Sequence, residues 1–334
     1  MKKQKWIRAG IIVAIGLAIL AAGILILRNN DEEQYKESRG QMSEGFGRLK
    51  VVEINGKKYR EKPAVTTILI AGVDKENAAE NAGNNSYRAG GQADFLVLLA
   101  IDNTDQKIHQ LQIDRDTMTD VITLGVFGNE VGTRVMQICL AHAFGASPED
   151  NAKYTVKAVQ NLLGGIDIDG YYMVDYSAVP VLNDALGGVT VKVEYDMTSV
   201  NPEWTQGSSV TLHGKEAETF VRTRKTIGEG TNRERMDRQN EFMRNATSRM
   251  KSLIKEDTGN ADSLVETLQG VCVTNMTTKR LAEELKEVSG YETLPVDRLE
   301  GEYSKGNNNV TQFHMKEGNA VEWVLEHLYT EVRE

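Results

Sequence analysis

Two apolar runs constrain the fold of this chain more than any other feature. Val65–Ala71 and Phe95–Asp102 are rich in β-branched and other aliphatic residues and show no regular alternation of polar and apolar positions. Such runs are typical of strands buried on both faces of a sheet, and helices usually provide that cover. His109–Ile113 is expected to form a third strand. The chain is therefore predicted to fold as an α/β domain.

Helical and strand patterns alternate through the rest of the chain. Helices are expected from Pro148 to Leu163, over Ala178–Ala185 and over Glu234–Ile254, with strands at Tyr171–Asp175 and Val189–Val193. Three further helical patterns are Gly214–Arg222, Thr278–Val288 and Ala320–Val332. The alternation predicts a three-layer α/β/α domain with a central mixed sheet.

A membrane anchor is expected near the N-terminus. Ala9–Leu27 contains no charged residue and approaches the roughly 20 residues that a helix needs to cross a bilayer. Basic residues precede it and acidic ones follow Arg28, which predicts a cytoplasmic N-terminus and an extracytoplasmic remainder on a cell membrane. The alternative is a cleaved signal peptide, because Ala21-Ala22-Gly23 could be a peptidase site. The apolar run is, however, longer than the roughly 7–15 residues usual there.

These patterns divide the chain into four parts. We expect a cytoplasmic tail at 1–8, a transmembrane signal anchor at 9–28, an extracytoplasmic stalk and hairpin at 29–63, and a globular domain at 64–334 with its core at 64–250. Asn55-Gly56 is the hairpin signal. The C-terminal stretch 256–334 is interpreted as helices that complete the outer layer of the domain.

The charge of the chain argues against nucleic acid as a partner. Five of its 39 basic residues flank the apolar segment, and the remaining 34 face 48 acidic residues, a net charge of −14. Sequence-independent DNA binding needs basic groups that neutralise phosphates. The two cysteines, Cys139 and Cys272, are far apart and have no zinc or redox spacing. A disulfide could form outside the cytoplasm, but two buried thiols are favoured.

Two aspartates lie beside the predicted strands. Asp74 follows Gly72-Val73 at the end of the first apolar run, and Asp94 directly precedes the second. If those strands are neighbours, the carboxylates meet at a sheet edge, where α/β folds bind ligands. Mg²⁺ usually binds one or two carboxylates together with substrate phosphate. The alternative is that Asp74 caps a turn and Asp94 merely ends a loop.

A set of arginines stands out in this acidic chain. Arg115-Asp116 follows the third predicted strand, at the same kind of edge. The later members of the set are Arg222, Arg224, Arg235 and Arg238, with Gln239 next to the last. Guanidinium groups bind phosphate oxygens, and Asp116 can orient Arg115 or act as a base. The alternatives are a surface ion pair and a solvated basic helix face.

As a set, these motifs resemble those of the LytR-CpsA-Psr family of bacterial envelope proteins over about residues 64–250. The matching fragments are Gly72-Val73-Asp74, Ala93-Asp94, Asp114-Arg115-Asp116-Thr117, Asp184–Val189, Arg222-Thr223-Arg224 and Arg235–Gln239. The resemblance implies an α/β/α domain with a long hydrophobic pocket for a polyprenyl chain. It also implies transfer of a glycopolymer from a polyprenyl-pyrophosphate carrier to peptidoglycan, with Mg²⁺, at the membrane of a Gram-positive-type cell.

The resemblance further implies roles for individual residues. Asp74 and Asp94 would hold the metal, and Asp116 would act with Arg115 at the reacting centre. The pyrophosphate would be bound by Arg115, Arg222, Arg224, Arg235, Arg238 and Gln239. Cell-membrane lipid, the lipid-linked polymer and peptidoglycan would be the partners, and nucleic acid would not.

Several positions depart from the family pattern. Gln92 stands where the family usually has arginine, Asp114 where it has proline, and Asn232 where it has an acidic residue. Gln137 and Cys139 replace an expected lysine and asparagine. Fewer cations motivate one alternative to the transferase, a catalytically degenerate protein that binds polyprenyl phosphates or wall polymer. Two further alternatives are a regulatory protein, and a pyrophosphate hydrolase in which water replaces the sugar hydroxyl.

Overall fold

The computed structural model describes residues 51–74, 90–125, 127–306 and 309–332. The expected tail at 1–8, the anchor at 9–28 and the stalk as far as residue 50 lie outside the described residues. Within the described ranges, no helix is both long and apolar enough to cross a membrane. The chain divides into two compact units, one comprising residues 1–63 and 330–334 and the other Ala64–Tyr329.

The first unit contains the predicted hairpin. Strands β1 (Val51–Ile54) and β2 (Lys57–Glu61) pair antiparallel around Asn55-Gly56, whose φ angles are 52° and 75°. Positive φ at both central positions is the geometry that an Asn-Gly turn favours. The third strand of this sheet is β15 (Tyr329–Glu331). The predicted helix Ala320–Val332 was therefore too long, because its last residues pair with β2.

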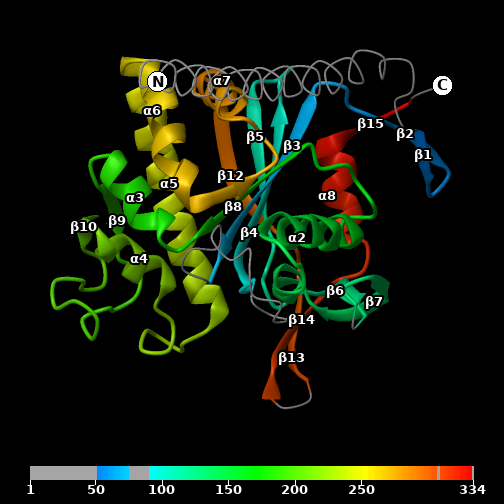
Figure 1. Ribbon diagram of the computed structural model, residues 1–334, viewed down its shortest axis with the longest axis horizontal. Coiled ribbons are helices and arrows are strands. Elements are labelled where there is room, and N and C mark those ends of the chain that lie inside the picture. Colours follow the sequence, from blue (N-terminus) through cyan, green and yellow to red (C-terminus); the bar gives the residue numbers. More distant parts are fainter. Residues whose placement is uncertain (1–50, 75–89, 126, 307–308, 333–334) are drawn as a thin grey trace, which may run out of the picture. The chain divides into compact units, whose positions relative to one another are not determined.

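A six-stranded mixed sheet forms the centre of the second unit (Figure 1). Its order is β11 (Cys272–Thr274), β8 (Gly170–Asp175), β3 (Val65–Val73), β4 (Ala93–Asp102), β5 (Lys107–Gln112) and β12 (Glu292–Arg298). The β3–β8 and β5–β12 pairs are parallel and the others antiparallel. Leu69, Leu96, Leu98 and Leu111 on these strands are fully buried. The predicted mixed sheet is confirmed.

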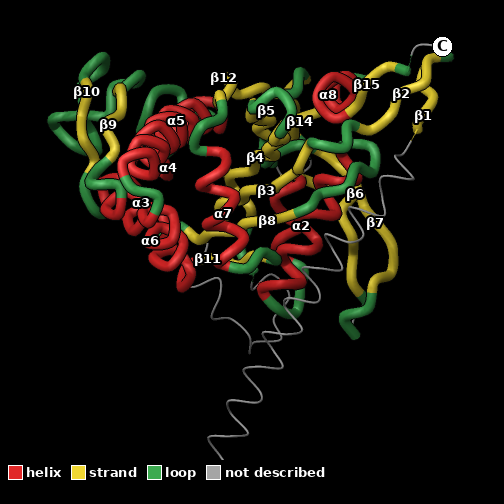
Figure 2. The backbone as a smooth tube through the Cα atoms, turned by 90° about the horizontal axis from the view of Figure 1, so that it is seen from above, coloured by secondary structure: helices red, strands yellow, loops and turns green. Residues whose placement is uncertain are grey.

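Helices cover both faces of this sheet (Figure 2). One face carries α3 (Ala178–Ala185), α5 (Asn232–Glu256), α6 (Gly259–Leu268) and α7 (Thr278–Val288), and the other α2 (Pro148–Leu162) and α8 (Asn319–Leu328). The register of the sheet agrees with this division of the helices. Gln110 pairs with Leu99, and the adjacent residue His109 points to the opposite face of the sheet. The His109 ring lies 4.3 Å from that of His327 in α8.

The smaller elements complete the unit. They are β6 (Met118–Leu124), β7 (Glu130–Gln137), the 3₁₀ helix η2 (Ile138–Ala143), β9 (Val189–Lys192), β10 (Ser209–Leu212), α4 (Lys215–Arg222), η3 (Gln269–Val271), β13 (Gly301–Lys305) and β14 (Thr311–Met315).

The interpretation of residues 256–334 as helices was only partly right. This stretch also contributes β11 and β12 to the central sheet, and β13 and β14 form a separate hairpin. Strand β12 is polar and contains Pro295, features that do not read as a buried strand from sequence. Both are tolerated because β12 lies at the edge of the sheet, where one side of its backbone needs no partner strand.

Candidate functional site

A β-bulge brings the two predicted aspartates to one end of the sheet. Gly72 pairs with Phe95 and Val73 with Ala93, which leaves Asp94 as the extra residue of β4. Such a bulge turns a side chain away from the regular alternation of the strand. Asp74 follows β3 directly, and its backbone N–H donates to the Gln92 carbonyl at 2.9 Å.

Asp94 is buried and is bound by two arginines from distant parts of the chain. The Arg115 guanidinium donates to Oδ1, and Nη1 of Arg235 donates to Oδ2 at 2.9 Å. The Tyr176 hydroxyl lies 3.4 Å from the same Oδ2. Two guanidiniums thus share the Asp94 carboxylate.

Arg115 also contacts two of the residues that depart from the family pattern. Its Nη2 donates to Gln92 Oε1 and, at 3.0 Å, to the Sγ of Cys139. Burial raises the pKa of the Cys139 thiol to about 12, although Arg115 lowers it. Cys139 is therefore a neutral acceptor, and neither it nor Cys272 is in a disulfide. The expectation of free thiols is confirmed, with Cys139 buried and Cys272 partly exposed.

The carboxylate of Asp116 lies on the other side of Arg115. Its Oδ1 is 3.5 Å from Arg115 Nε and accepts a hydrogen bond from Gln137 Nε2 at 2.9 Å. Burial raises the pKa of Asp116, and the Asp114 charge raises it further, whereas Arg115 and the Gln137 amide lower it. A buried carboxylate with a raised pKa beside a guanidinium is well suited to accept a proton.

The carboxylate of Asp114 accepts hydrogen bonds that hold the loop of Arg115 and Asp116 in place. Its Oδ1 accepts from the Asp116 backbone N–H at 2.8 Å and from Asn232 Nδ2 at 2.9 Å. The Tyr303 hydroxyl donates to its Oδ2. Two departures from the family pattern, Asp114 and Asn232, are therefore partners of each other. Tyr303 was missed in the sequence because nothing in β13 marks it as a neighbour of a loop some 190 residues earlier.

The remaining predicted arginines fall into two groups. Arg222 is about half exposed, pairs with Glu218 at 2.9 Å and lies 4.6 Å above the Tyr176 ring. Arg224 follows α4, and its positive charge lowers the pKa of Asp116. Arg222, Arg224 and Arg235 therefore lie around the aspartate site.

Arg238 is placed differently from the prediction. It is buried and donates to the backbone carbonyls of Phe220, Glu234 and Thr223. Its burial lowers the pKa of the guanidinium to about 10. These contacts hold Arg238 at the junction of α4 and α5, with its guanidinium turned to backbone carbonyls. Gln239 is turned to the same junction, with Nε2 3.4 Å from the Val221 carbonyl.

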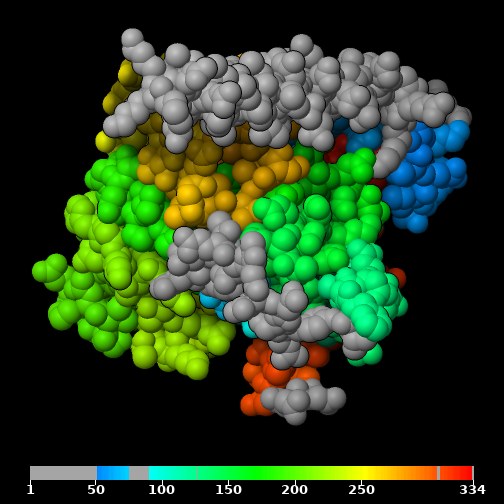
Figure 3. Space-filling view, in the orientation of Figure 1, coloured from blue at the N-terminus to red at the C-terminus, as the bar shows by residue number. Residues whose placement is uncertain are grey.

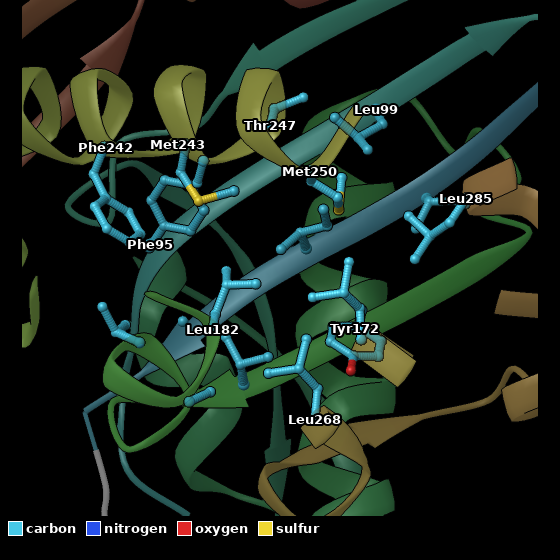
Figure 4. Close-up of a pocket in the computed structure, with 18 of the residues that line it drawn as sticks. Phe95, Leu99, Tyr172, Leu182, Phe242, Met243, Thr247, Met250, Leu268 and Leu285 are labelled. Atoms are coloured by element: carbon cyan, nitrogen blue, oxygen red, sulfur yellow. The ribbon is translucent and has the colours of Figure 1, made fainter. Parts of the chain in front are cut away.

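An apolar cavity of about 280 Å³ lies between the sheet and α3, α5, α6 and α7 (Figure 4). Representative lining residues are Phe95, Leu99, Leu182, Met243, Leu268 and Leu285. The cavity is also lined by Gly72, next but one to Asp74, and by Tyr176, which contacts Asp94. The cavity therefore reaches the aspartate–arginine site at one end. Its residues come from eight helices and strands, so sequence spacing alone could not define it.

The described residues contain no group of three or more His, Cys, Asp or Glu side chains placed to hold a metal ion. Asp74 and Asp94 are a pair of oxygen donors at one end of the sheet. Burial raises the pKa of Asp74, and the negative charge of Asp94 adds to this effect. Since their repulsion would be relieved by a cation, the pair fits a divalent ion that takes its other ligands from phosphate and water.

Fold and site together define an α/β protein in which an apolar cavity meets a buried cluster of arginines and aspartates. The chain belongs to the LytR_cpsA_psr family, whose model matches residues 26–327.

Named relatives share part of this sequence. A protein of Halalkalibacterium halodurans named polyisoprenyl-teichoic acid–peptidoglycan teichoic acid transferase TagU is 30% identical over 164 residues, 49% of this chain and 46% of that protein. The TagU of Oceanobacillus iheyensis is 28% identical over 250 residues, 73% of this chain and 70% of that protein. The crystal structure of Bacillus subtilis TagV has the same fold, with a TM-score of 0.61 at 24% identity, covering 80% of this chain and 98% of that one.

Proposed function

We propose that this protein transfers a glycopolymer from a polyprenyl-pyrophosphate carrier to peptidoglycan. The observation that carries the proposal is the meeting of an apolar cavity with the aspartate–arginine site at Tyr176, which lines the cavity and contacts Asp94. A lipid-linked pyrophosphate has the same two parts, a long apolar chain and a compact anion. The relatives named as teichoic acid transferases support this substrate class.

The cavity would hold the isoprenoid chain. Its aliphatic lining offers no strong competing hydrogen bonds, and burying apolar surface contributes about 25 cal/mol per Å². Met243 and Met250 of α5 are flexible side chains that can adapt to a chain of changing shape. The lipid would thereby hold the pyrophosphate at the end of the cavity.

The arginine cluster would bind the pyrophosphate. The Nε atoms of Arg115 and Arg235 are buried and have no hydrogen-bond acceptor among the described residues. Buried unpaired donors are rare because each costs about 1–3 kcal/mol. Phosphate oxygens would satisfy them, and Arg222 and Arg224 would add charge from the side of α4.

Asp74 and Asp94 would hold a Mg²⁺ ion together with phosphate oxygens. When bound, the ion would neutralise charge on the pyrophosphate as the leaving group departs. Arg115 and Arg235 hold the Asp94 carboxylate in place. The proposal of a metal ion rests on the repulsion between the Asp74 and Asp94 carboxylates, which a cation would relieve.

Asp116 would act as the general base. An acceptor hydroxyl of the glycan would attack the phosphorus that bears the polymer, forming a new O–P bond. The P–O–P bridge would break, and polyprenyl phosphate would leave with the bonding electrons. The hydroxyl proton would pass to Asp116, whose raised pKa favours accepting it. We further propose that the domain works outside the cell membrane, tethered by the segment at 9–28.

A second candidate function is binding of the lipid-linked polymer without turnover. Arg115 already uses Nη1 on Asp94 and Nη2 on the neutral groups of Gln92 and Cys139. Only Nε, which lies 3.5 Å from Asp116 Oδ1 without a hydrogen bond, is left for phosphate. Replacing Gln92→Arg would add the missing cation. A rise in turnover would show a transferase whose pyrophosphate site lacks a cation. Unchanged donor binding with no turnover would show a binding protein.

Product analysis separates the reaction classes. Full-length protein in detergent would be given a polyprenyl-pyrophosphate-linked disaccharide with and without peptidoglycan oligomers. We expect sugar on the glycan only when the oligomers are present. Sugar phosphate released into water at the same rate without acceptor would instead identify a hydrolase.

A further inference from the structure

The C-terminal hairpin of β13 and β14 contacts the loop that carries Arg115 and Asp116. The hairpin protrudes from the second unit and shows its side chains at the surface (Figures 1 and 3). Tyr303 pairs with Phe313 across the hairpin, and their rings lie 5.0 Å apart. No role at the site was predicted for residues of this hairpin.

The first connection runs through Tyr303. Its ring is partly exposed, yet its hydroxyl donates to Oδ2 of the buried Asp114. The other oxygen of Asp114 accepts from the backbone N–H of Asp116 and from Asn232. All three of these donors are neutral groups, so none of them cancels the charge by which the Asp114 carboxylate raises the pKa of Asp116. The Tyr303 hydroxyl partly screens that charge.

The second connection runs through β14. The Phe313 backbone N–H donates to the Asp116 carbonyl at 2.8 Å. Gln137 spans the same gap, because its Nε2 lies 2.9 Å from Asp116 Oδ1 and 2.8 Å from the Thr311 carbonyl. Backbone and carboxylate of Asp116 are therefore both tied to the hairpin, directly or through one amide.

We propose that the β13–β14 hairpin is a positioning arm of the active site, and that Tyr303 is a positioning residue that acts on Asp116 through Asp114. The proposal rests on the proposed function, in which Asp116 is the base. The contact of Tyr303 with the loop of Asp116 is to Asp114, which is why it is proposed as a positioning and not a catalytic residue. The charged groups that act on Asp116 are Arg115 and Asp114 from its own loop and Arg224 from beyond α4.

Replacing Tyr303→Phe tests the proposal directly. The variant keeps the ring contact with Phe313 and removes only the hydroxyl. We expect kcat to fall about tenfold with the KM for the donor within about twofold, because a misplaced base lowers the rate of the chemical step. The acid limb of the pH–rate profile should move to higher pH, since the Asp114 charge is less screened. Glu302→Gln on the same strand is the control and should leave both unchanged.

A double-mutant cycle shows whether Tyr303 works through Asp114. Asp114→Asn removes the charge that raises the pKa of Asp116, so its acid limb should move down. Adding Tyr303→Phe to that variant should then produce no further shift, because the hydroxyl no longer screens a charge. Equal upward shifts in both backgrounds would overturn the route through Asp114.

A measurement without turnover separates this proposal from the proposed function. The Asp116 carboxyl can be titrated by carbon-13 NMR in aspartate-labelled full-length protein in micelles, with Asp116→Asn for assignment. Tyr303→Phe should raise this titration midpoint even if the wild-type protein transfers no sugar, a result that would reject only the transferase. A midpoint and thermal stability equal to wild type would overturn the positioning arm.

Discussion

Replacing Arg238 tests which arginines stabilise the fold and which ones bind the ligand. Its guanidinium is buried, and three backbone carbonyls accept from it at the junction of α4 and α5. Arg222, in contrast, is about half exposed and has one ion pair, with Glu218 four residues earlier. The two arginines should therefore respond in opposite ways to replacement by methionine, which keeps the aliphatic stem.

The magnitude follows from the bonds that are lost. Each buried carbonyl left without its donor costs about 1–3 kcal/mol, and loss of one partner from a buried charged network costs about 3–5 kcal/mol. We take about 4 kcal/mol for Arg238→Met, which corresponds to a fall in Tm of about 10 °C for a domain of this size. An exposed ion pair contributes about 0.3–0.5 kcal/mol, so Arg222→Met should shift Tm by no more than about 2 °C.

Thermal unfolding and pyrophosphate binding, both measured on the full-length chain in detergent, form the assay. We expect Arg238→Met to unfold early and, at a temperature where it is folded, to bind pyrophosphate within about threefold of wild type. Arg222→Met should keep its Tm and bind about tenfold more weakly, since it loses a guanidinium facing the anion. If Arg238→Met keeps the wild-type Tm but no longer binds pyrophosphate, the reasoning is refuted and Arg238 is a ligand-binding residue.

Three further predictions follow from the site and the cavity. Gln137→Met removes a hydrogen bond that lowers the pKa of Asp116, so the acid limb of the pH–rate profile should move to higher pH. Thr247→Trp should fill the cavity and raise the KM for a long-chain donor about tenfold without changing pyrophosphate affinity, whereas Ser248→Trp on the exposed side of α5 should do neither. Burial raises the pKa of Glu284 above its unfolded value, so its favourable contribution is present below the unfolded pKa and is lost as pH rises through the folded pKa. Glu284→Gln should therefore raise Tm at pH 8 and leave it unchanged at pH 4.

A specific result would contradict each of these three predictions. An acid limb that stays in place in Gln137→Met would mean that Asp116 does not set it. Equal KM values for Thr247→Trp and Ser248→Trp would place the lipid outside the cavity. A lower Tm for Glu284→Gln at pH 8 would mean that the ion pair with Arg280, at 3.8 Å, outweighs the cost of burial.

The sequence predicted the parts of the fold that depend on local pattern. Ala178–Ala185 and Thr278–Val288 are helices with the predicted bounds, because their apolar periodicity lies within the segments themselves. Strands β3 and β4 were recognised from their composition. Strand β12 was not, since a polar edge strand with a proline is defined by its partner β5 and not by its own residues.

The candidate site shows the same division. Asp74, Asp94, Arg115 and Asp116 were found because each lies at the end of a recognisable strand. Tyr303 could not be found, because its role depends on how a distant hairpin folds back onto the loop. Arg238 fitted the arginine pattern, but only its contacts show that the guanidinium turns inward.

The residues that depart from the family pattern contact one another or share a partner, so their effects are better understood in pairs. Asn232 donates to Asp114, so an unexpected carboxylate and an unexpected amide satisfy each other. Gln92 and Cys139 both accept from Nη2 of Arg115. The pocket around Arg115 therefore keeps its hydrogen bonds with fewer cations, which predicts weaker binding of the anion and not a collapsed site.

The most direct test of the central proposal is acceptor-dependent transfer by the full-length protein, with and without Mg²⁺, beside the variant Arg115→Ala. The proposal predicts that sugar from a polyprenyl-pyrophosphate-linked disaccharide appears on peptidoglycan oligomers, and that a chelator or the substitution abolishes it. Donor that is bound but remains intact under all of these conditions would contradict the transferase.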